Sequence, residues 1–337
     1  MAIWQGLYTR TVRALITLLL VAVLGVGGWV AWLVYAPVTP PANSSLLLHS
    51  GYSTRRIASE LKKAGVIRSE LVFRLWHEVH PKPSLKAGEY HFEREASLPQ
   101  VYERIARGDI YFHVVTIPEG YTMFDIAKAM EDAGLGSAAD FLHIAETQTQ
   151  LISDLAPDAK SLEGYLFPNT YQFTRTQSLE EMTATMVRQF RQVAQQIGLN
   201  SDIPRVVTMA SIVEKETAAP EERPRVASVY YNRLAQSMAL GADPSVIYAE
   251  LLTGTYQGGL HHADLAVNSP YNTYRFPGLP PGPIANPGRS ALEAAMHPDS
   301  TRFLYFVSAG NGHHRFARSL EEHNRNVAAY RRSLGLR

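Results

Sequence analysis

The feature that most constrains this chain is an uninterrupted apolar run near its N-terminus, Ala14 to Val34. The run reads ALITLLLVAVLGVGGWVAWLV and contains no charged residue and one hydroxyl, that of Thr17. As a helix, a run of this length crosses hydrocarbon about 30 Å thick. It exceeds the apolar segment of about 7 to 15 residues in a cleavable signal peptide, and no A-x-A-like site follows it. We therefore predict a transmembrane helix at residues 14–34.

The charges around this run predict its orientation. Arg10 and Arg13 precede it, and the next basic residue is Arg55. Because Lys and Arg accumulate on the cytoplasmic side of a span, residues 1–13 are expected in the cytoplasm and the rest of the chain outside. Residues 35–45, YAPVTPPANSS, are rich in Pro and small polar residues and are expected to form an extended linker.

The composition of the rest of the chain excludes several function classes. All 31 acidic residues and 30 of the 32 basic ones follow the apolar run, so this body has a net charge of −1. We expect no nucleic-acid partner from such a balance. The absence of cysteine excludes disulfides, thiolate catalysis and Cys-type zinc sites. The paired histidines, such as His261 and His262, lack the i, i+4 spacing of helical zinc ligands, so no metal is predicted.

A weak internal repeat indicates two similar helices. GYSTRRIASELKKAGV from Gly51 aligns with GYTMFDIAKAMEDAGL from Gly120. In each copy a hydroxyl residue after Gly-Tyr is suited to cap a helix, which Gly65 or Gly134 is suited to end. The remaining pattern predicts strands at 46–48, 86–92 and 114–117 and helices at 98–107, 180–196 and 204–217.

These elements predict an α+β fold in two parts behind the anchor. Residues 46–112 form a small βααβ-like module that resembles LysM domains, which bind glycans containing N-acetylglucosamine. The pattern leaves open whether this module binds glycan or only braces its neighbour. Residues 113–337 form a larger α+β domain. Its loop from Ser269 to Gly288 is rich in Pro and aromatic residues, and long ordered loops of this kind often form binding sites.

Two carboxylates at the end of one predicted helix are the main catalytic candidates. Glu214 and Glu216 fall on opposite borders of an apolar face centred on Ala210. Burial at either border would raise the pKa of the carboxyl group. A carboxylic acid that stays protonated near neutral pH is what general-acid cleavage of a glycosidic bond requires. The spacing alone does not choose between the two acids, and it also fits a solvated acidic helix end.

Five motifs, taken together, resemble one known family. They are LEGYLFPNTY from Leu162, ASIVEKETA from Ala210, VASVYYNRL from Val226, ADPSVIYA from Ala242, and SPYNTYRFPGLPPGPIANPG from Ser269. In this order, behind an anchor and a LysM-like module, they are similar to the endolytic murein transglycosylase, or YceG-like, family. The similarity covers the whole layout of the chain. It departs from the family at Asn169, where Asp is common.

The resemblance implies a reaction and a catalytic residue. The family's catalytic acid is the second one of the E-K-E-T stretch, which is Glu216 here. The implied reaction cleaves the β-1,4 bond between N-acetylmuramic acid and N-acetylglucosamine in nascent peptidoglycan strands and leaves 1,6-anhydro ends. One carboxyl group serves as acid and then as base, so neither a cofactor nor a metal is implied.

Four further residues are predicted to bind substrate: Glu163, Tyr271, Asn272 and Thr273. Glu163 lies in a family motif that resembles part of the cleft wall, and its alternative role is a turn or helix-cap carboxylate. Asn272 and Thr273 are suited to bond hydroxyl or N-acetyl groups while the ring of Tyr271 stacks on a sugar, with packing inside the loop as the alternative. Asp243 is expected to cap a helix.

The predicted partners are peptidoglycan strands and the membrane, with peptidoglycan synthases as a further class. The resemblance implies an inner-membrane protein whose catalytic domain lies in the periplasm. Two other functions stay open on the residues alone. One is a glycoside hydrolase in which Glu163 or Asp243 assists Glu216, and the other is a non-catalytic anchored scaffold that binds peptidoglycan.

Overall fold

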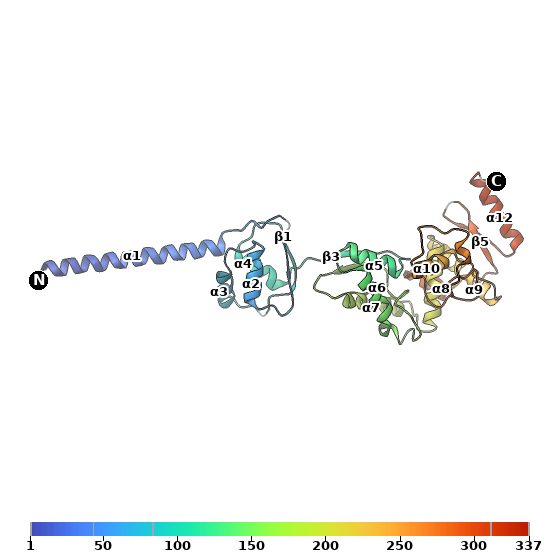
Figure 1. Ribbon diagram of the computed structural model, residues 1–337, viewed down its shortest axis with the longest axis horizontal. Helices are drawn as coiled ribbons and strands as arrows, with labels where there is room; N and C mark the ends of the chain where they lie inside the picture. The colour runs from blue at the N-terminus through green and yellow to red at the C-terminus, as the bar shows by residue number, and fades with distance from the viewer. Residues whose placement is uncertain (1, 43, 83, 311, 336–337) are drawn as a thin grey trace. The chain divides into compact units, whose positions relative to one another are not determined.

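The computed structural model describes residues 2–42, 44–82, 84–310 and 312–335, with side chains from residue 12 onward. Helices alternate with short strands along the chain (Figure 1). The strands form three two-stranded sheets, so the predicted α+β class is confirmed. The chain divides into two compact units, residues 1–113 with 174–176, and residues 114–173 with 177–337.

Helix α1, Ala2–Tyr35, begins the first unit. Its segment Val12–Tyr35 is long and apolar enough to cross a membrane, judged by length and composition. The apolar side chains along most of this segment are exposed, whereas Leu33 and Val34 are buried in the core of the first unit. The predicted helix is therefore present, and its C-terminal end packs on the first unit.

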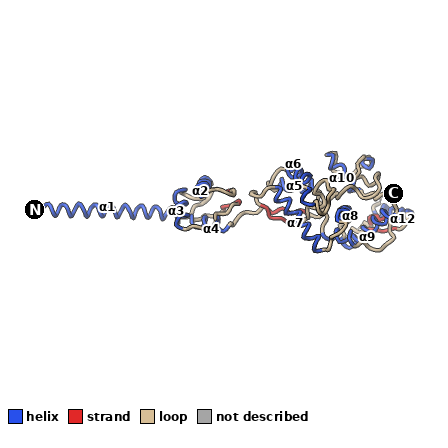
Figure 2. The backbone as a smooth tube through the Cα atoms, turned by 90° about the horizontal axis from the view of Figure 1, so that it is seen from below, coloured by secondary structure: helices blue, strands red, loops and turns tan. Residues whose placement is uncertain are grey.

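The rest of the first unit is a small module with one core. Strand β1 (Ser44–Leu48) pairs antiparallel with β2 (Gly88–Phe92). Helices α2 (Thr54–Lys63), α3 (Glu70–Val79) and α4 (Leu98–Arg107) contribute to the same hydrophobic core (Figure 2). Successive side chains of β1 point to opposite faces of the sheet, so Leu46 and Leu48 both point into this core. The order β1, α2, α3, β2 is the predicted βααβ order.

The segment that follows α1, which was expected to form an extended linker, is held against the module by hydrogen bonds. Val38 exchanges two backbone hydrogen bonds with Ala96, at 2.9 and 3.1 Å. The guanidinium of Arg68 donates to the carbonyl oxygens of Ala36, at 2.5 Å, and Pro37, at 2.6 Å. A Pro-rich segment forms little regular structure, so its carbonyls are open to a charged donor, and such bonds are stronger than neutral ones. Helix α1 is thereby attached directly to the module.

The second unit contains the larger core. Its strand pairs are β3 (His113–Ile117) with β4 (Asn169–Phe173), and β5 (Tyr305–Ser308) with β6 (His314–Ala317). Its α-helices are α5 (Met123–Asp132), α6 (Ala138–Thr147), α7 (Leu179–Gln196), α8 (Ile203–Glu216), α9 (Arg223–Ala235), α10 (Asp243–Thr253), α11 (Arg289–Met296) and α12 (Leu320–Ser333). Helix α5 packs on α6, while α9, α10 and α11 pack around α8.

Both copies of the internal repeat form capped helices, as predicted. In α2 and α5 the hydroxyls of Ser53 and Thr122 each accept the backbone N–H of the residue three positions later. Gly65 and Gly134 follow these helices with φ of +69° and +67°. Only glycine adopts this left-handed conformation without steric cost, so the helices end there.

Helix α8 is buried on every side from Val207 to Val213, which contradicts the predicted amphipathic face. Inside the protein, the Ser211 hydroxyl donates to the Thr208 carbonyl at 2.7 Å and accepts the Ile284 N–H at 3.0 Å. The hydroxyl of Ser211 therefore has hydrogen-bond partners although it is fully buried.

Asn286 connects the long loop to the rest of the second unit and is fully buried. Its side-chain amide donates to Glu163, at 2.7 Å, and to the Tyr121 carbonyl, at 2.9 Å. Its side-chain oxygen accepts the Leu166 N–H at 2.9 Å. The loop is therefore ordered because one side-chain amide makes three hydrogen bonds to two distant segments, at Tyr121 and at residues 163–166.

We expect Asn286→Ala to lower the free energy of unfolding by roughly 2–5 kcal/mol, because it leaves buried partners unpaired. Urea unfolding of the full-length protein in detergent, followed by far-UV circular dichroism, measures this loss. The control is Asn169→Ala, whose exposed side chain accepts the adjacent Thr170 N–H. Equal unfolding midpoints for the two variants would contradict the role of Asn286.

Candidate active site

The last turn of α8 holds Glu214 in a buried ion pair. One carboxylate oxygen of Glu214 accepts from Arg223 at 2.6 Å, and the other accepts the Gly288 N–H at 3.0 Å. The side chains of Glu214 and Arg223 are only 5% and 6% exposed. Burial raises the pKa of Glu214, and the Gly288 N–H and Arg223 oppose that rise. Both oxygens of Glu214 are therefore engaged in holding the framework.

Glu216, two residues later, has a different environment. One oxygen accepts the hydroxyl of Tyr230 at 2.8 Å, and the other accepts no hydrogen bond from the residues described. Burial raises the pKa of Glu216 to about 7, although the Tyr230 bond favours the charged form. The negative end of the α8 dipole also disfavours ionisation here. Glu216 is thus a carboxylic acid that exchanges its proton near neutral pH.

Three polar residues near Glu216 come from other elements. Asp243 and Arg233 shift the pKa of Glu216 in opposite directions, with Asp243 raising it. The Tyr274 hydroxyl donates to Asp243 at 2.5 Å, and the ring of Tyr274 is 41% exposed. Arg233 is held by the carbonyls of Leu240 and Leu304, each at 2.6 Å. Glu216 therefore lies among polar side chains that are themselves held in place by hydrogen bonds.

The sequence alone did not indicate all of these polar residues near Glu216. Tyr230 and Arg233 lie within the motif VASVYYNRL, and their i, i+3 spacing places them on one side of α9. This spacing is the signal in the sequence that could have identified them. Tyr274 directly follows the three residues selected in the loop. Asp243 is not the cap of α10, since that position is Ala242, and its side chain instead binds Tyr274.

Glu163 is 2% exposed and has both of its oxygens occupied. They accept the Met123 N–H at 2.9 Å and the side-chain amide of Asn286 at 2.7 Å. Burial raises the pKa of Glu163 to about 8. Because Met123 is the first residue of α5, this contact matches the alternative role of a helix-end carboxylate. Glu163 also borders a small cavity of about 120 Å³, together with Tyr271.

Asn272 and Thr273 are buried and hold the loop rather than face a ligand. The Asn272 amide donates to the carbonyls of Leu265 and Val267, at 3.0 and 2.8 Å. The Thr273 hydroxyl accepts the Ala242 N–H at 2.9 Å. Their exposed fractions are 0% and 1%, so both side chains take part in the packing of the loop. Polar residues in a loop that packs on itself are used internally.

Tyr271 is partly buried and lies against Tyr248, with ring centroids 5.1 Å apart. Tyr274 and Phe276, by contrast, are 41% and 39% exposed. The loop therefore directs one aromatic ring inward and two outward. The rings available for contact with a sugar are the outward ones.

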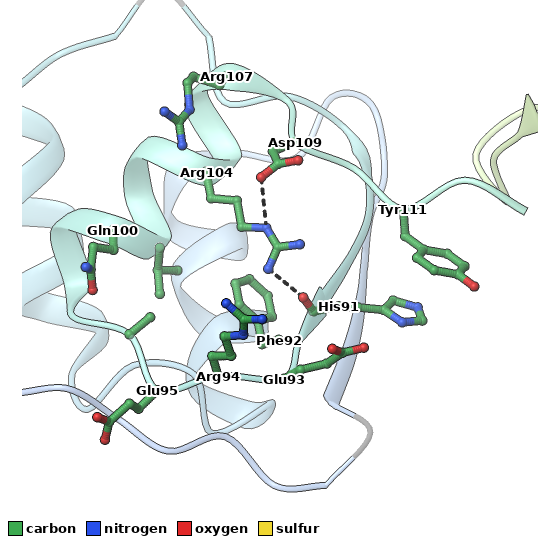
Figure 3. A pocket seen from close by; sticks show the side chains of 12 residues that line it. His91, Phe92, Glu93, Arg94, Glu95, Gln100, Arg104, Arg107, Asp109 and Tyr111 are labelled. Atoms are coloured by element: carbon green, nitrogen blue, oxygen red, sulfur yellow. Dashed lines mark hydrogen bonds and ion pairs between the residues drawn. The ribbon is translucent and has the colours of Figure 1, made fainter.

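The first unit has a hollow of its own, of about 470 Å³, on the side of β2 and α4 (Figure 3). Arg104 crosses it, donating to the His91 carbonyl at 2.5 Å and pairing with Asp109 at 3.5 Å. The Tyr111 ring stacks on His91 at 3.9 Å. Three arginines and three carboxylates line this hollow, and its acids are exposed. It therefore offers no buried acid comparable with Glu216.

The histidine pairs are used in local contacts. His261 lies 3.3 Å from Asp264, and His314 lies 2.7 Å from Glu222. Within the described ranges, no three His, Cys, Asp or Glu side chains gather as metal ligands would.

Glu216 is therefore a candidate general acid–base residue, because it combines burial, a raised pKa and a single hydrogen bond from Tyr230. The YceG-like family model matches residues 46–329. The chain therefore belongs to the YceG-like family, and it is an enzyme of the lytic transglycosylase class.

Individual relatives agree with this assignment. A Bacillus subtilis protein named endolytic murein transglycosylase is 36% identical over 302 residues, covering 83% of each chain. A Streptococcus pneumoniae protein of the same name is 30% identical over 313 residues, and the match covers 83% of this chain and 57% of that relative. A crystal structure of a putative YceG-like protein from Listeria monocytogenes aligns with a TM-score of 0.56 at 32% identity. That alignment covers 83% of this chain and 97% of the Listeria chain.

The raised pKa of Glu216 predicts that Glu216→Gln stabilises the protein at high pH. In the unfolded chain this carboxyl ionises near 4.5, but in the folded protein it ionises near 7. Its contribution is therefore absent below about pH 4.5, and stability is lost as the pH rises from there to 7. Glutamine carries no charge and avoids this cost, which we place at roughly 2–3 kcal/mol.

Urea unfolding of the native protein and Glu216→Gln at pH 4 and pH 8 measures the effect. The variant should gain stability over the native protein at pH 8 and not at pH 4. A difference between the two proteins that is the same at both pH values would contradict the raised pKa.

Proposed function

We propose that this protein is an endolytic lytic transglycosylase of peptidoglycan with Glu216 as its catalytic acid and base. It cleaves the β-1,4 bond between N-acetylmuramic acid and N-acetylglucosamine and leaves 1,6-anhydromuramic ends. The observation that carries the proposal is the half-buried Glu216 carboxyl, whose pKa of about 7 lets it give and take a proton at neutral pH. The relatives named endolytic murein transglycosylase support murein as the substrate.

The proposed reaction needs one carboxyl group. Protonated Glu216 donates its proton to the glycosidic oxygen, and the C1–O bond breaks as positive charge develops at C1. The resulting carboxylate accepts the proton of the sugar's own C6 hydroxyl while that oxygen bonds to C1. The acid is thereby regenerated, and no water is consumed. Tyr230 stabilises the carboxylate between the two steps through its hydrogen bond.

The surroundings favour this route over hydrolysis. A hydrolase of the usual kind needs a second carboxylate to activate water or attack the sugar. Glu163 and Glu214 each have both oxygens engaged inside the protein. Asp243 is bound by the Tyr274 hydroxyl. Each of these carboxylates already has a partner, which supports a mechanism with Glu216 alone.

We propose that Tyr274 and Phe276 contact the glycan, in place of Asn272 and Thr273. Both rings are exposed, and Tyr274 lies near enough to Glu216 for this carboxylate to raise the pKa of the Tyr274 hydroxyl. Aromatic rings bind sugars by stacking against their C–H faces, which desolvates apolar area on both partners. The stacking would hold the sugar next to the acid.

We also propose that α1 crosses the inner membrane with residues 1–13 in the cytoplasm and the two folded units in the periplasm. The length of α1 and the arginines before its apolar run support this orientation. An anchored enzyme of this kind acts on nascent strands close to the membrane, where peptidoglycan synthases would be neighbouring partners.

Glu216→Gln is expected to abolish cleavage of purified peptidoglycan, with a loss of at least about 10³-fold, because the amide cannot donate the proton. Glu214→Gln is the matched control two residues away on the same helix. It should retain turnover per folded molecule but lower stability by roughly 2–4 kcal/mol, because Arg223 loses a buried partner. Mass spectrometry of the soluble products gives the activity, and urea unfolding gives the stability.

The products distinguish the proposed function from its alternatives. Anhydro ends made by the native protein and lost in Glu216→Gln support it. Reducing ends would identify a hydrolase, and unchanged strands would identify a scaffold. A variant pair in which Glu214→Gln is inactive while folded and Glu216→Gln is active would overturn the choice of acid.

Tyr274 variants test the glycan contact. Tyr274→Ala should raise KM for soluble glycan strands about tenfold, because it removes a stacking ring, whereas Tyr274→Phe should stay within about threefold. Steady-state kinetics on uncrosslinked strands measures both. Equal KM values for the Phe and Ala variants would show that the ring does not bind the sugar.

A further inference from the structure

Helix α3 has apolar side chains that are exposed, in addition to those that it buries in the core of the first unit. Val72 and Phe73 are buried in the core of the first unit. Leu71, Leu75 and Val79 follow one another at i, i+4 spacing and are 60%, 56% and 70% exposed. We call these three side chains the α3 stripe. An exposed aliphatic row of this kind on a small module indicates an interaction surface.

The α3 stripe is continuous with the outer end of α1. An apolar groove of about 480 Å³ lies between the two helices, lined by the stripe and by α1 from Gly27 to Tyr35. Helix α1 meets the module beside α3 in Figures 1 and 2. The contact is fixed by the ring of Trp76 against Tyr35, at 6.2 Å, and by Arg68 over the ring of Trp32, at 4.5 Å.

The groove lies at a defined depth if α1 crosses the membrane, so this step rests on the span proposed above. At 1.5 Å per residue, hydrocarbon about 30 Å thick centred on Val12–Tyr35 ends near Leu33. The groove then lies within roughly the outer 10 Å of the leaflet. Trp29 and Trp32, which are 61% and 52% exposed, lie at the same level, where indole rings are favoured.

We propose that α3 is an interfacial helix, with its stripe inserted into the outer leaflet of the bilayer that α1 crosses. Phospholipid acyl chains fill the groove between α1 and α3. Lipid is the occupant that the structure favours, because the stripe and the groove continue the lipid-facing surface of α1 without a break. The first unit then contacts the membrane through two helices held at a fixed angle, so its orientation on the bilayer is set.

Spin labels at single cysteines test the insertion, and the chain has no native cysteine to remove. The full-length protein in phosphatidylethanolamine and phosphatidylglycerol nanodiscs is labelled at Leu75→Cys, at Glu70→Cys, or at Leu24→Cys within α1. Glu70 is exposed on the same helix, about 140° from Leu75 on a helical wheel, and serves as the matched control. Collision rates with oxygen and with a water-soluble nickel chelate report the depth of each label.

We expect the oxygen-to-chelate ratio at Leu75 to exceed that at Glu70 at least about threefold and to approach that at Leu24. A water-like ratio at Leu75 beside a lipid-like ratio at Leu24 overturns the insertion and leaves the span intact. Exclusion of both reagents at Leu75 also overturns it, because protein such as a second copy then covers the stripe. A water-like Leu24 overturns the proposed span itself. Labelling Leu71→Cys repeats the test if Leu75→Cys does not fold.

Discussion

The burial of α8 is the constraint on which the second unit depends. Glu214, which directly follows the enclosed segment from Val207 to Val213, is only 5% exposed, so its carboxylate needs partners from the protein. The elements that surround α8 therefore supply those partners. Arg223 from α9 and the Gly288 N–H before α11 bind Glu214, and Tyr230 from α9 binds Glu216.

This arrangement gives two glutamate side chains different hydrogen-bond partners and different pKa values. Glu214 faces a guanidinium and a backbone N–H, so both of its oxygens are bound and it stabilises the fold. Glu216 faces a neutral hydroxyl and a distant arginine, so burial dominates and its pKa rises to about 7. Two residues on one helix turn therefore differ, since Glu214 holds the framework whereas Glu216 has a pKa of about 7.

The long loop around Asn286 also fixes the positions of side chains in the second unit. Its buried amides and hydroxyls hold the chain in place, and two aromatic rings are left on its surface. In the first unit, hydrogen bonds hold the end of α1 against the module. They come from Arg68 and from the bridge between Val38 and Ala96.

The sequence by itself determined the elements and the family. Capping residues, glycines and apolar periodicity predicted the helices from Thr54 and Met123 and the strands beside them, because these signals act over a few residues. Five motifs in order were enough to indicate the YceG-like family and, through it, Glu216.

Only the tertiary structure decided which side chains face inward. Thr273 and Glu163 have the polarity of ligand-binding residues, but they form hydrogen bonds with Ala242 and Asn286, which are far away along the chain. Asn272 is bonded within its own loop. The burial of α8 and the attachment after α1 escaped prediction for the same reason. The local sequence pattern shows which hydrogen bonds a side chain is able to form, whereas long-range packing decides which ones it does form. Packing therefore determines whether a carboxyl group stabilises the fold or titrates near neutral pH.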